Sequence, residues 1–177
     1  MASELTVQTL RGPTSGANAD TVLIPSGQTL HAPGHVIQVV EGSTNTPNST
    51  SSTSAVNSGL DATITPLSAT SKILVAASFP HHCVEEPGTD VQAYLFLKRL
   101  ISGGSDTELA GTISGDHTGN ASRSDAWSSV HMQCLDSPAT TTSITYRVQH
   151  RVGNGGWQST CMVSNNRGSI TLMEIAQ

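Results

Sequence analysis

The stretch SITLMEI, residues 169–175, alternates strongly apolar side chains with other side chains along a short segment. Ile170, Leu172 and, less cleanly, Glu174 fall on one face, and the residues between them fall on the other. A period of two is that of an extended chain with one face toward a core. The stretch therefore predicts a β-strand at the end of the chain.

Similar runs rich in Val, Ile, Leu and Thr recur along the rest of the chain, separated by Gly, Pro, Ser and Asn. The one helix candidate, Ala93–Ile101, fits a buried strand better, and no stretch has a convincing 3.6-residue apolar period. Short strands with turns between them predict an all-β fold, a jelly-roll-like β-sandwich. The expected strands are Leu5–Leu10, Thr21–Ile24, His35–Glu41, Leu60–Pro66, Lys72–Phe79, Val91–Leu100, Thr107–Ser114, Trp127–Leu135, Ser143–Val152, Gln158–Val163 and Ser169–Ile175.

Two connections between the expected strands have a distinctive composition. Asn154-Gly155-Gly156 supplies residues that tolerate positive φ, and it predicts a tight hairpin between the strands that flank it. Residues 44–58 are a low-complexity run of mainly Ser, Thr and Asn. The run fits either a linker or an exposed edge strand, and we favour a strand with a loose loop.

The first 34 residues differ from the rest, because Gly and Pro divide them into pieces too short to form a core. We therefore predict an N-terminal extended arm or short β shaft over residues 1–34 and a β-sandwich head over residues 35–177. The arm's aliphatic side chains must find partners on neighbouring copies or on a docking surface. A disordered tail is the alternative. These side chains are Leu5, Val7, Leu10, Val22, Leu23, Ile24 and Leu30.

Charged residues make up 12% of the chain and the net charge is −5, so a cationic stripe for a phosphate backbone is missing and we expect no nucleic-acid partner. No apolar run approaches the roughly 20 residues of a membrane span, and the polar start predicts no secretory signal. The three cysteines, Cys83, Cys134 and Cys161, are then expected to be reduced thiols in a protein made in the cytoplasm.

His81-His82-Cys83, followed by two glutamates, is the densest group of potential metal ligands. Neighbours on a strand point to opposite faces, so such a run seldom holds one ion. A zinc site assembled from Cys83, His131 and Cys134 is conceivable. We favour loop histidines and buried thiols, and expect no metal and no cofactor.

No arrangement of residues indicates catalysis. A Gly-x-Ser-x-Gly elbow is absent, and the carboxylates are few. Gly153-Asn154-Gly155-Gly156 lacks the lysine and the helix of a phosphate-binding loop. We therefore expect a protein that is not an enzyme.

Seven phrases of the sequence, in their order, resemble small virion proteins of tailed bacteriophages, especially marine ones, of the fibre-like or decoration (cement) type. The phrases cover most of the chain except roughly residues 80–130. They are ELTVQTLRGP (4–13), IPSGQTL (24–30), GHVIQVV (34–40), GLDATITP (59–66), SKILV (71–75), LDSP (135–138) and SITLMEI (169–175).

The resemblance implies a homotrimer located on the virion and made in the host bacterial cytoplasm, with the arm bound to the major capsid protein or to tail proteins. The chain departs from long fibres in being short, and it lacks a long repeat and an obvious receptor-binding tip. A jelly-roll module that binds host-surface glycans is the alternative, although its six aromatic residues are scattered.

Overall fold

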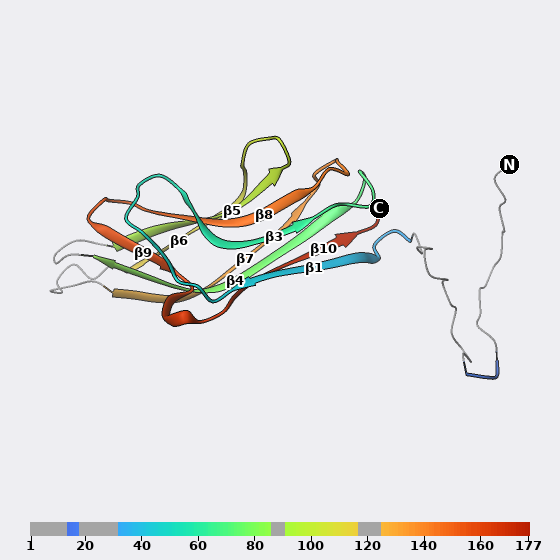
Figure 1. Ribbon diagram of the computed structural model, residues 1–177, viewed down its shortest axis with the longest axis horizontal. Coiled ribbons are helices and arrows are strands. Elements are labelled where there is room, and N and C mark those ends of the chain that lie inside the picture. The colour runs from blue at the N-terminus through green and yellow to red at the C-terminus, as the bar shows by residue number, and fades with distance from the viewer. Residues whose placement is uncertain (1–13, 18–31, 86–90, 117–124) are drawn as a thin grey trace. The chain divides into compact units, whose positions relative to one another are not determined.

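The computed structural model describes residues 14–17, 32–85, 91–116 and 125–177 (Figure 1). The fold is all-β, as the sequence predicts, with one 3₁₀ turn, η1 (Val163–Asn165), and no α-helix among these residues. No helix in this part of the chain is long and apolar enough to cross a membrane. The strands are β1 (Val36–Thr44), β2 (Asn48–Thr50), β3 (Val56–Ile64), β4 (Lys72–Glu85), β5 (Val91–Ile101), β6 (Thr107–Asp116), β7 (Asp125–Asp136), β8 (Ile144–Val152), β9 (Trp157–Cys161) and β10 (Gly168–Ile175).

By its internal contacts the chain divides into two units, Met1–His31 and Ala32–Gln177. The second unit, here called the head, contains all ten strands that the structure describes. The first and last segments of the head are hydrogen-bonded to each other. The Gly34 amide donates to the Ala176 carbonyl at 2.8 Å, and the Ala176 amide donates to the His35 carbonyl at 2.9 Å. The pairing of the head's first segment with its last therefore starts at Gly34, and the His35 amide also donates back to the Ala32 carbonyl at 3.0 Å.

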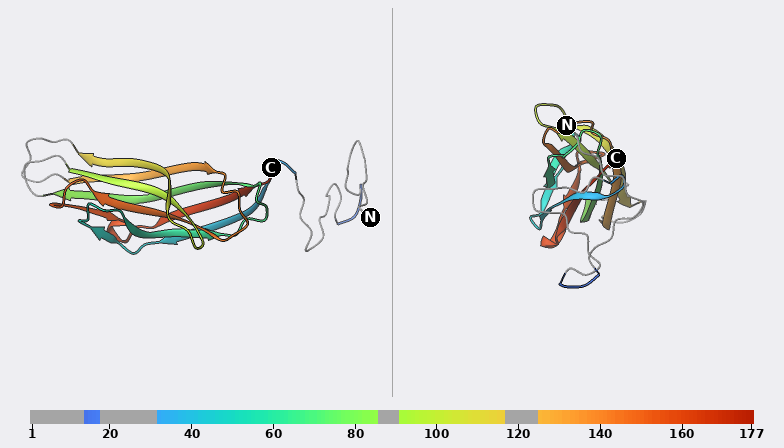
Figure 2. Two further views of the ribbon diagram at one scale, coloured as in Figure 1. Left: turned by 90° about the horizontal axis from the view of Figure 1, so that it is seen from above. Right: turned by 90° about the vertical axis from the view of Figure 1, so that its right-hand side faces the viewer.

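The head consists of two antiparallel sheets packed as a sandwich (Figure 2). The six-stranded sheet runs β1-β10-β4-β9-β2, with β7 on the other edge of β4, and the four-stranded sheet runs β3-β8-β5-β6. Without the short strands β2 and β9, the sheets are β1-β10-β4-β7 and β3-β8-β5-β6. Two four-stranded sheets interleaved along the chain in this order have the connectivity of a jelly roll.

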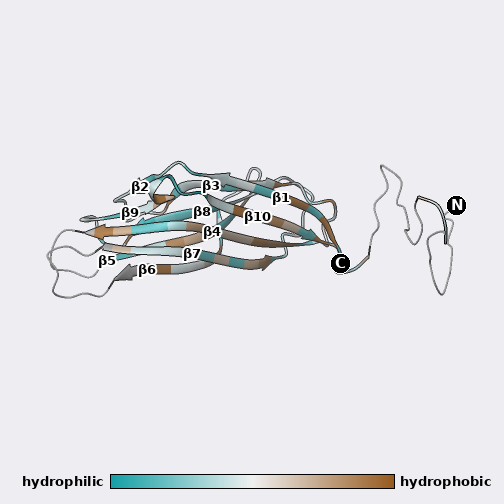
Figure 3. Cartoon of the chain, turned by 90° about the horizontal axis from the view of Figure 1, so that it is seen from below, coloured by the Kyte–Doolittle hydropathy of each residue, from teal (hydrophilic) through white to brown (hydrophobic). Residues whose placement is uncertain are grey.

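Alternation of side chains along the strands builds the core between the sheets, and the strands show it as bands of contrasting hydropathy (Figure 3). In β10, Ile170, Leu172 and Glu174 are buried, as their spacing predicts. Glu174 is tolerated because its Oε1 accepts the amides of Leu67 at 2.8 Å and Ser68 at 3.3 Å, which holds the loop before β4. The fully buried apolar residues of the core include Leu60, Ile64, Ile73, Val75, Leu95, Leu97, Ile144 and Val148.

Two local predictions are wrong. The turn at Asn154-Gly155-Gly156 is tight, with the Trp157 amide donating to the Asn154 carbonyl at 3.1 Å, but it is not a hairpin. It carries the chain from β8 in one sheet to β9 in the other. The second error concerns β4, which continues through His81, His82 and Cys83 instead of ending at Phe79 in a loop. Residues 44–58 contain the end of β1, the short β2 and the start of β3, so the prediction of a strand with a loose loop is confirmed.

The edges of the two sheets come close together where β1 passes β3. A Cβ atom on Gly42 of β1 would lie far inside van der Waals contact with the Asp61 carbonyl oxygen of β3. A side chain there would have to push the two backbones apart, because carbonyl atoms cannot turn aside as a flexible side chain can. Glycine is therefore required at this position by the close approach.

Gly42→Ala should lower the free energy of unfolding by about 1–3 kcal/mol, the usual cost of overpacking. Gly155→Ala is the matched control, since a Cβ there meets nothing within 4 Å, and it should change stability by less than about 0.5 kcal/mol. Urea unfolding of both variants measures the difference. Equal stabilities would show that β1 and β3 do not approach as described.

Candidate functional site

Several polar residues inside the head form a row across neighbouring strands of the six-stranded sheet. His81 of β4 lies opposite Cys161 of β9 and Ser128 of β7, and Cys161 lies opposite Asn48 of β2. Residues directly opposite one another on neighbouring strands share a face of the sheet. His81 and Cys161 are fully buried, so this row faces the interior.

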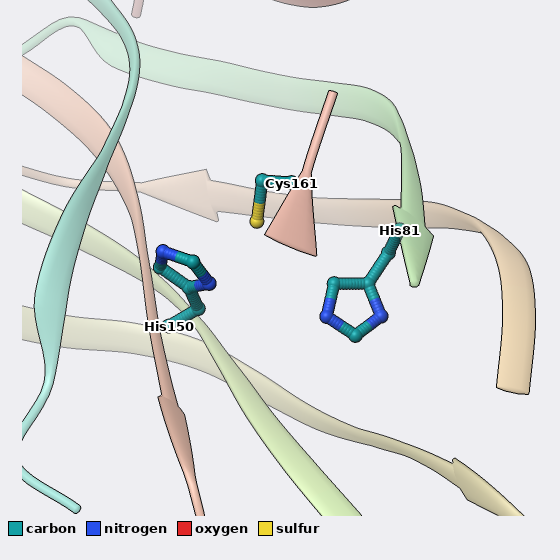
Figure 4. A group of neighbouring side chains, drawn as sticks. All are labelled: His81, His150 and Cys161. Atoms are coloured by element: carbon teal, nitrogen blue, oxygen red, sulfur yellow. The ribbon is translucent and has the colours of Figure 1, made fainter. Parts of the chain in front are cut away.

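The four-stranded sheet places His150 of β8 and Ser114 of β6 against that row, and both are buried. Ser159, two residues before Cys161 on β9, is also fully buried. The rings of His81 and His150 each turn one nitrogen toward the other, with the Cys161 sulfur beside the gap (Figure 4). Residues far apart in the sequence thus form one cluster, called the polar cluster below: Asn48, His81, Ser114, Ser128, His150, Ser159 and Cys161.

Hydrogen bonds link six of these side chains into one unbranched chain. Ser128 Oγ lies 2.9 Å from Ser114 Oγ, and Ser114 Oγ lies 3.1 Å from His81 Nδ1. Ser159 Oγ lies 2.8 Å from both His81 Nε2 and His150 Nδ1. His150 Nε2 lies 2.9 Å from Asn48 Oδ1. Four of these five contacts join one sheet to the other.

The direction of every hydrogen bond follows from the Asn48 end, because an amide oxygen accepts and does not donate. His150 Nε2–H must donate to Asn48, so the neutral ring accepts at Nδ1 from the Ser159 hydroxyl. Ser159 Oγ then accepts from His81 Nε2–H, and His81 Nδ1 accepts from Ser114. Ser114 in turn accepts from Ser128, so each neutral ring has both nitrogens satisfied.

Burial keeps both rings neutral. Desolvation, with smaller contributions from the nearby His150 and His82, lowers the pKa of His81 from 6.5 to about 3. Desolvation also lowers the pKa of His150 from 6.5 to about 4. The same cause raises the pKa of the Cys161 thiol from 9.0 to about 12. The isolated cluster therefore has no charge on these three groups near neutral pH.

The structure separates the residues of the His81-His82-Cys83 run and corrects the prediction of loop histidines. All three lie on β4, with His81 and Cys83 buried toward the interior. His82 points outward, where its ring stacks on the Trp127 ring with centroids 4.1 Å apart. Replacement of His81 would leave Ser114 and Ser159 without their histidine partner in a buried site, which costs far more than a change in a solvated loop.

The conceivable zinc site from Cys83, His131 and Cys134 is not assembled. Cys83 is buried, whereas His131 is exposed on the outer face of β7, opposite Ser78. Cys134 lies three residues further along β7, opposite Val75 and on the other face from His131. Burial followed by proximity to Asp136 raises the pKa of the Cys134 thiol to about 11.

A second buried polar group lies near the other end of β4, where Asp136 of β7 is opposite Ile73. Arg99 Nη1 donates to both Asp136 carboxylate oxygens, at 2.8 and 3.0 Å. The Tyr146 hydroxyl donates to Oδ2 at 2.7 Å and the Ser137 amide to Oδ1 at 2.9 Å. Burial and the Asp136 hydrogen bond raise the Tyr146 pKa, so this hydroxyl stays protonated as a donor.

The predicted contact residues of the arm cannot be placed. Leu5, Val7, Leu10, Val22, Leu23, Ile24 and Leu30 lie outside the described residues.

Sequence reasoning singled out one member of the polar cluster, His81, as a potential ligand, and it treated Cys161 only as a reduced thiol. His150 was missed, because it stands between arginines in a strand that shows no ligand motif. The alternation of side chains along β8 could have revealed it. Every second residue of this strand, Ile144, Tyr146 and Val148, is buried, and the same spacing buries residue 150.

Comparison with known proteins adds little. No family model matches the chain, and no curated protein matches it. Among solved structures, "Structure of infectious bursal disease virus Gx strain" matches 94% of this chain and 46% of its own, with 9% sequence identity and a TM-score of 0.25. The chain thus spans less than half of that protein, and a likeness this weak carries no argument about fold or function.

Folding should become weaker as the pH falls from 7 to 5. Both histidines are neutral when folded but bind protons near pH 6.5 when unfolded. Stability from these rings is complete above pH 6.5 and is lost as the pH falls toward about 3–4, the folded-state values. Each unfolded ring takes up its proton only below about pH 6.5, so the slope of about 1.4 kcal/mol per pH unit applies over part of this range. The two rings together therefore lower the free energy of unfolding by about 3–4 kcal/mol between pH 7 and pH 5.

Urea unfolding across this range measures the effect. His150→Gln, which keeps a hydrogen-bonding side chain but does not titrate, should reduce the pH dependence by about half. His131→Gln changes an exposed histidine and serves as the control. A free energy of unfolding in the wild type that does not change between pH 7 and pH 5 would show that the rings are not buried as neutral bases.

Proposed function

We propose that this chain is a non-enzymatic structural protein of a virion, a homotrimer displayed on the particle surface as a short fibre or a capsid decoration protein. The observation that carries the proposal is the placement of exposed apolar side chains on strands at the sheet edges. Of the six large exposed apolar residues in the described part of the chain, five belong to β1, β6 or β7: Val36, Val39, Ile113, Trp127 and Leu135.

Edge strands present unpaired backbone groups that other chains can pair with. A monomer usually protects such strands with charge, whereas here Ile113 is 59% and Leu135 is 54% exposed. Copies arranged around a closed axis would cover these edges and side chains together. The low content of charged residues suits close contact, since few ions lose their water.

The histidines of the polar cluster support a structural role. A general base must reach its substrate, but His81 and His150 are fully buried and their ring nitrogens are hydrogen-bonded to side chains of the head. The sequence phrases that resemble phage virion proteins point to the same class. Attachment through residues 1–34 to capsid or tail proteins remains part of the proposal.

A glycan-binding module is the second candidate, and one observation favours it. Trp127 is 63% exposed and stacks on His82, beside a hollow lined by Pro80, Ser129 and Asn166. Sugars bind such combinations of an aromatic ring and polar side chains. Binding to a glycan array that is lost on Trp127→Ala would favour this candidate over a purely structural protein.

The purified full-length chain should be a trimer at micromolar concentration by light scattering. Ile113→Thr with Leu135→Thr keeps strand-forming residues but removes apolar surface from two edges, and should weaken the trimer at least about tenfold. Leu67→Thr is the matched control, because Leu67 is equally exposed but lies in the loop between β3 and β4. A monomeric wild type, or equal effects of both changes, would contradict edge-mediated assembly.

Deletion of residues 2–34 should leave a folded head that no longer decorates particles lacking the native protein. The deletion removes two backbone hydrogen bonds of the head, from the Gly34 amide to the Ala176 carbonyl and from the His35 amide to the Ala32 carbonyl, and it leaves every described strand intact. Three arms would act together, and trivalency multiplies modest single-arm affinities by about 10² or more when the geometry allows all to bind. Circular dichroism checks the fold and electron microscopy measures occupancy. Full occupancy without the arm would assign attachment to the head.

A further inference from the structure

His81, His150 and Cys161 form a possible set of metal ligands, and Cys161 is the member of the polar cluster that lies outside its chain of hydrogen bonds. One potential ligand atom from each residue lies within 4.8 Å of the other two. The three side chains come from β4, β8 and β9, and they point toward a common space (Figure 4). Two imidazoles and a thiol in this arrangement are the ligands preferred by soft and borderline transition metals.

The outer nitrogen of the His150 ring is already held as metal sites require, and that of His81 has a hydroxyl partner to which it could donate after a change of tautomer. Histidines that bind metals hydrogen-bond through the other ring nitrogen, which fixes the orientation of the ring. His150 Nε2 donates to Asn48 Oδ1, so its Nδ1 lone pair faces inward. His81 Nδ1 contacts Ser114 Oγ, and its Nε2 faces inward toward Ser159. The inward ligand atoms are then His81 Nε2, His150 Nδ1 and Cys161 Sγ, and the two nitrogens now share Ser159 Oγ as their hydrogen-bond partner at 2.8 Å.

The charge of the site selects among the ions. Among the residues that the structure describes, no carboxylate belongs to the polar cluster, and the ligands are fully buried, so a net charge there would lack water and a counter-ion from this part of the chain. Zn²⁺ with one thiolate and two neutral imidazoles leaves a charge of +1, whereas Cu⁺ with the same ligands is neutral. We propose that His81, His150 and Cys161 bind one Cu⁺ ion in a trigonal site. This inference does not depend on the proposed virion function.

Binding requires a rearrangement of these hydrogen bonds with a balanced exchange of protons. Cys161 releases its thiol proton to solvent as its sulfur bonds to Cu⁺, so one proton leaves for each ion bound. His81 moves its proton from Nε2 to Nδ1 and then donates to Ser114, whose hydroxyl turns toward Ser128. Buried Ser159 loses both histidine partners and turns away from the ion, a cost that the bonds to the metal must exceed. Because the ligands are fully buried, the ion enters during folding or by transient opening of the head.

The experiment refolds the metal-free full-length chain from urea under anaerobic, reducing conditions with Cu⁺, and in parallel with Zn²⁺. One Cu⁺ per chain should remain after gel filtration and should resist competition by bicinchoninate. X-ray absorption of the wild-type complex should show one sulfur and two nitrogen neighbours around copper. At a hundredfold excess of Cu⁺ over the dissociation constant, the unfolding midpoint should rise by roughly 5–10 °C.

Variants separate this site from adventitious binding. Cys161→Ser should weaken Cu⁺ binding by more than about 100-fold, and Asn48→Ala, which releases the His150 ring, by about 10–100-fold. Cys83→Ser is the control, since Cys83 is buried on the same strand as His81 but lies outside the ligand set. If Cys161→Ser does not fold, the absorption spectrum of the wild type still decides the question.

Three results would overturn the proposal. The first is failure of the refolded wild type to retain Cu⁺. The second is a copper environment without sulfur, or unchanged binding by a folded Cys161→Ser variant, either of which would place the ion on surface histidines. The third is retention of Zn²⁺ but not Cu⁺, which would show that the charge of the buried site does not select the ion.

Discussion

The double pairing of β4 is the constraint on which the rest of the head depends. One edge of β4 pairs with β7 from Ile73 to Val84, while the other edge pairs first with β10, from Lys72 to Ser78, and then with β9, from His81 to Glu85. The change of partner is possible because of Pro80. The Pro80 carbonyl accepts the Met162 amide at 2.9 Å on this edge, so its missing N–H faces the gap between β10 and β9, where no ladder partner is required.

Strand β4 therefore contributes to an apolar interior at one end and to a polar interior at the other. Before Pro80 its inward residues are apolar and join the core, and after Pro80 they are His81 and Cys83. At the polar end, hydrogen bonds between the two sheets replace part of the apolar contact. They contribute mainly specificity, because a one-residue slip of β4 would turn His81 outward and leave Ser114 and Ser159 without their partner. Register is thus fixed by apolar burial at one end of the strand and by hydrogen bonding at the other.

The local pattern of the sequence was sufficient to predict most of the strands, because the alternation of apolar residues and the presence of turn residues depend only on neighbouring positions. It failed where β4 crosses Pro80 into His81-His82-Cys83, since a proline followed by polar residues is typical of a loop. The polar cluster could not be predicted in this way. Its members come from β2, β4, β6, β7, β8 and β9, and the jelly-roll connectivity together with the exact register brings them together. A shift of one residue in β9 would replace Cys161 with Thr160 opposite His81.

Strand β7 joins this interior to the surface proposed for assembly. It lies at a sheet edge, and it exposes Trp127 and Leu135. The neighbours of these two residues point inward and are bound to the other sheet, Ser128 to Ser114 on β6 and Asp136 to Arg99 on β5 and Tyr146 on β8. Force applied to β7 by a partner would therefore pass to the four-stranded sheet at both ends of the strand, as well as to β4 through the backbone ladder. An edge strand that is bound both to its own sheet and to the opposite sheet should resist being separated from the head. This property would suit the contact between copies that we propose for this edge.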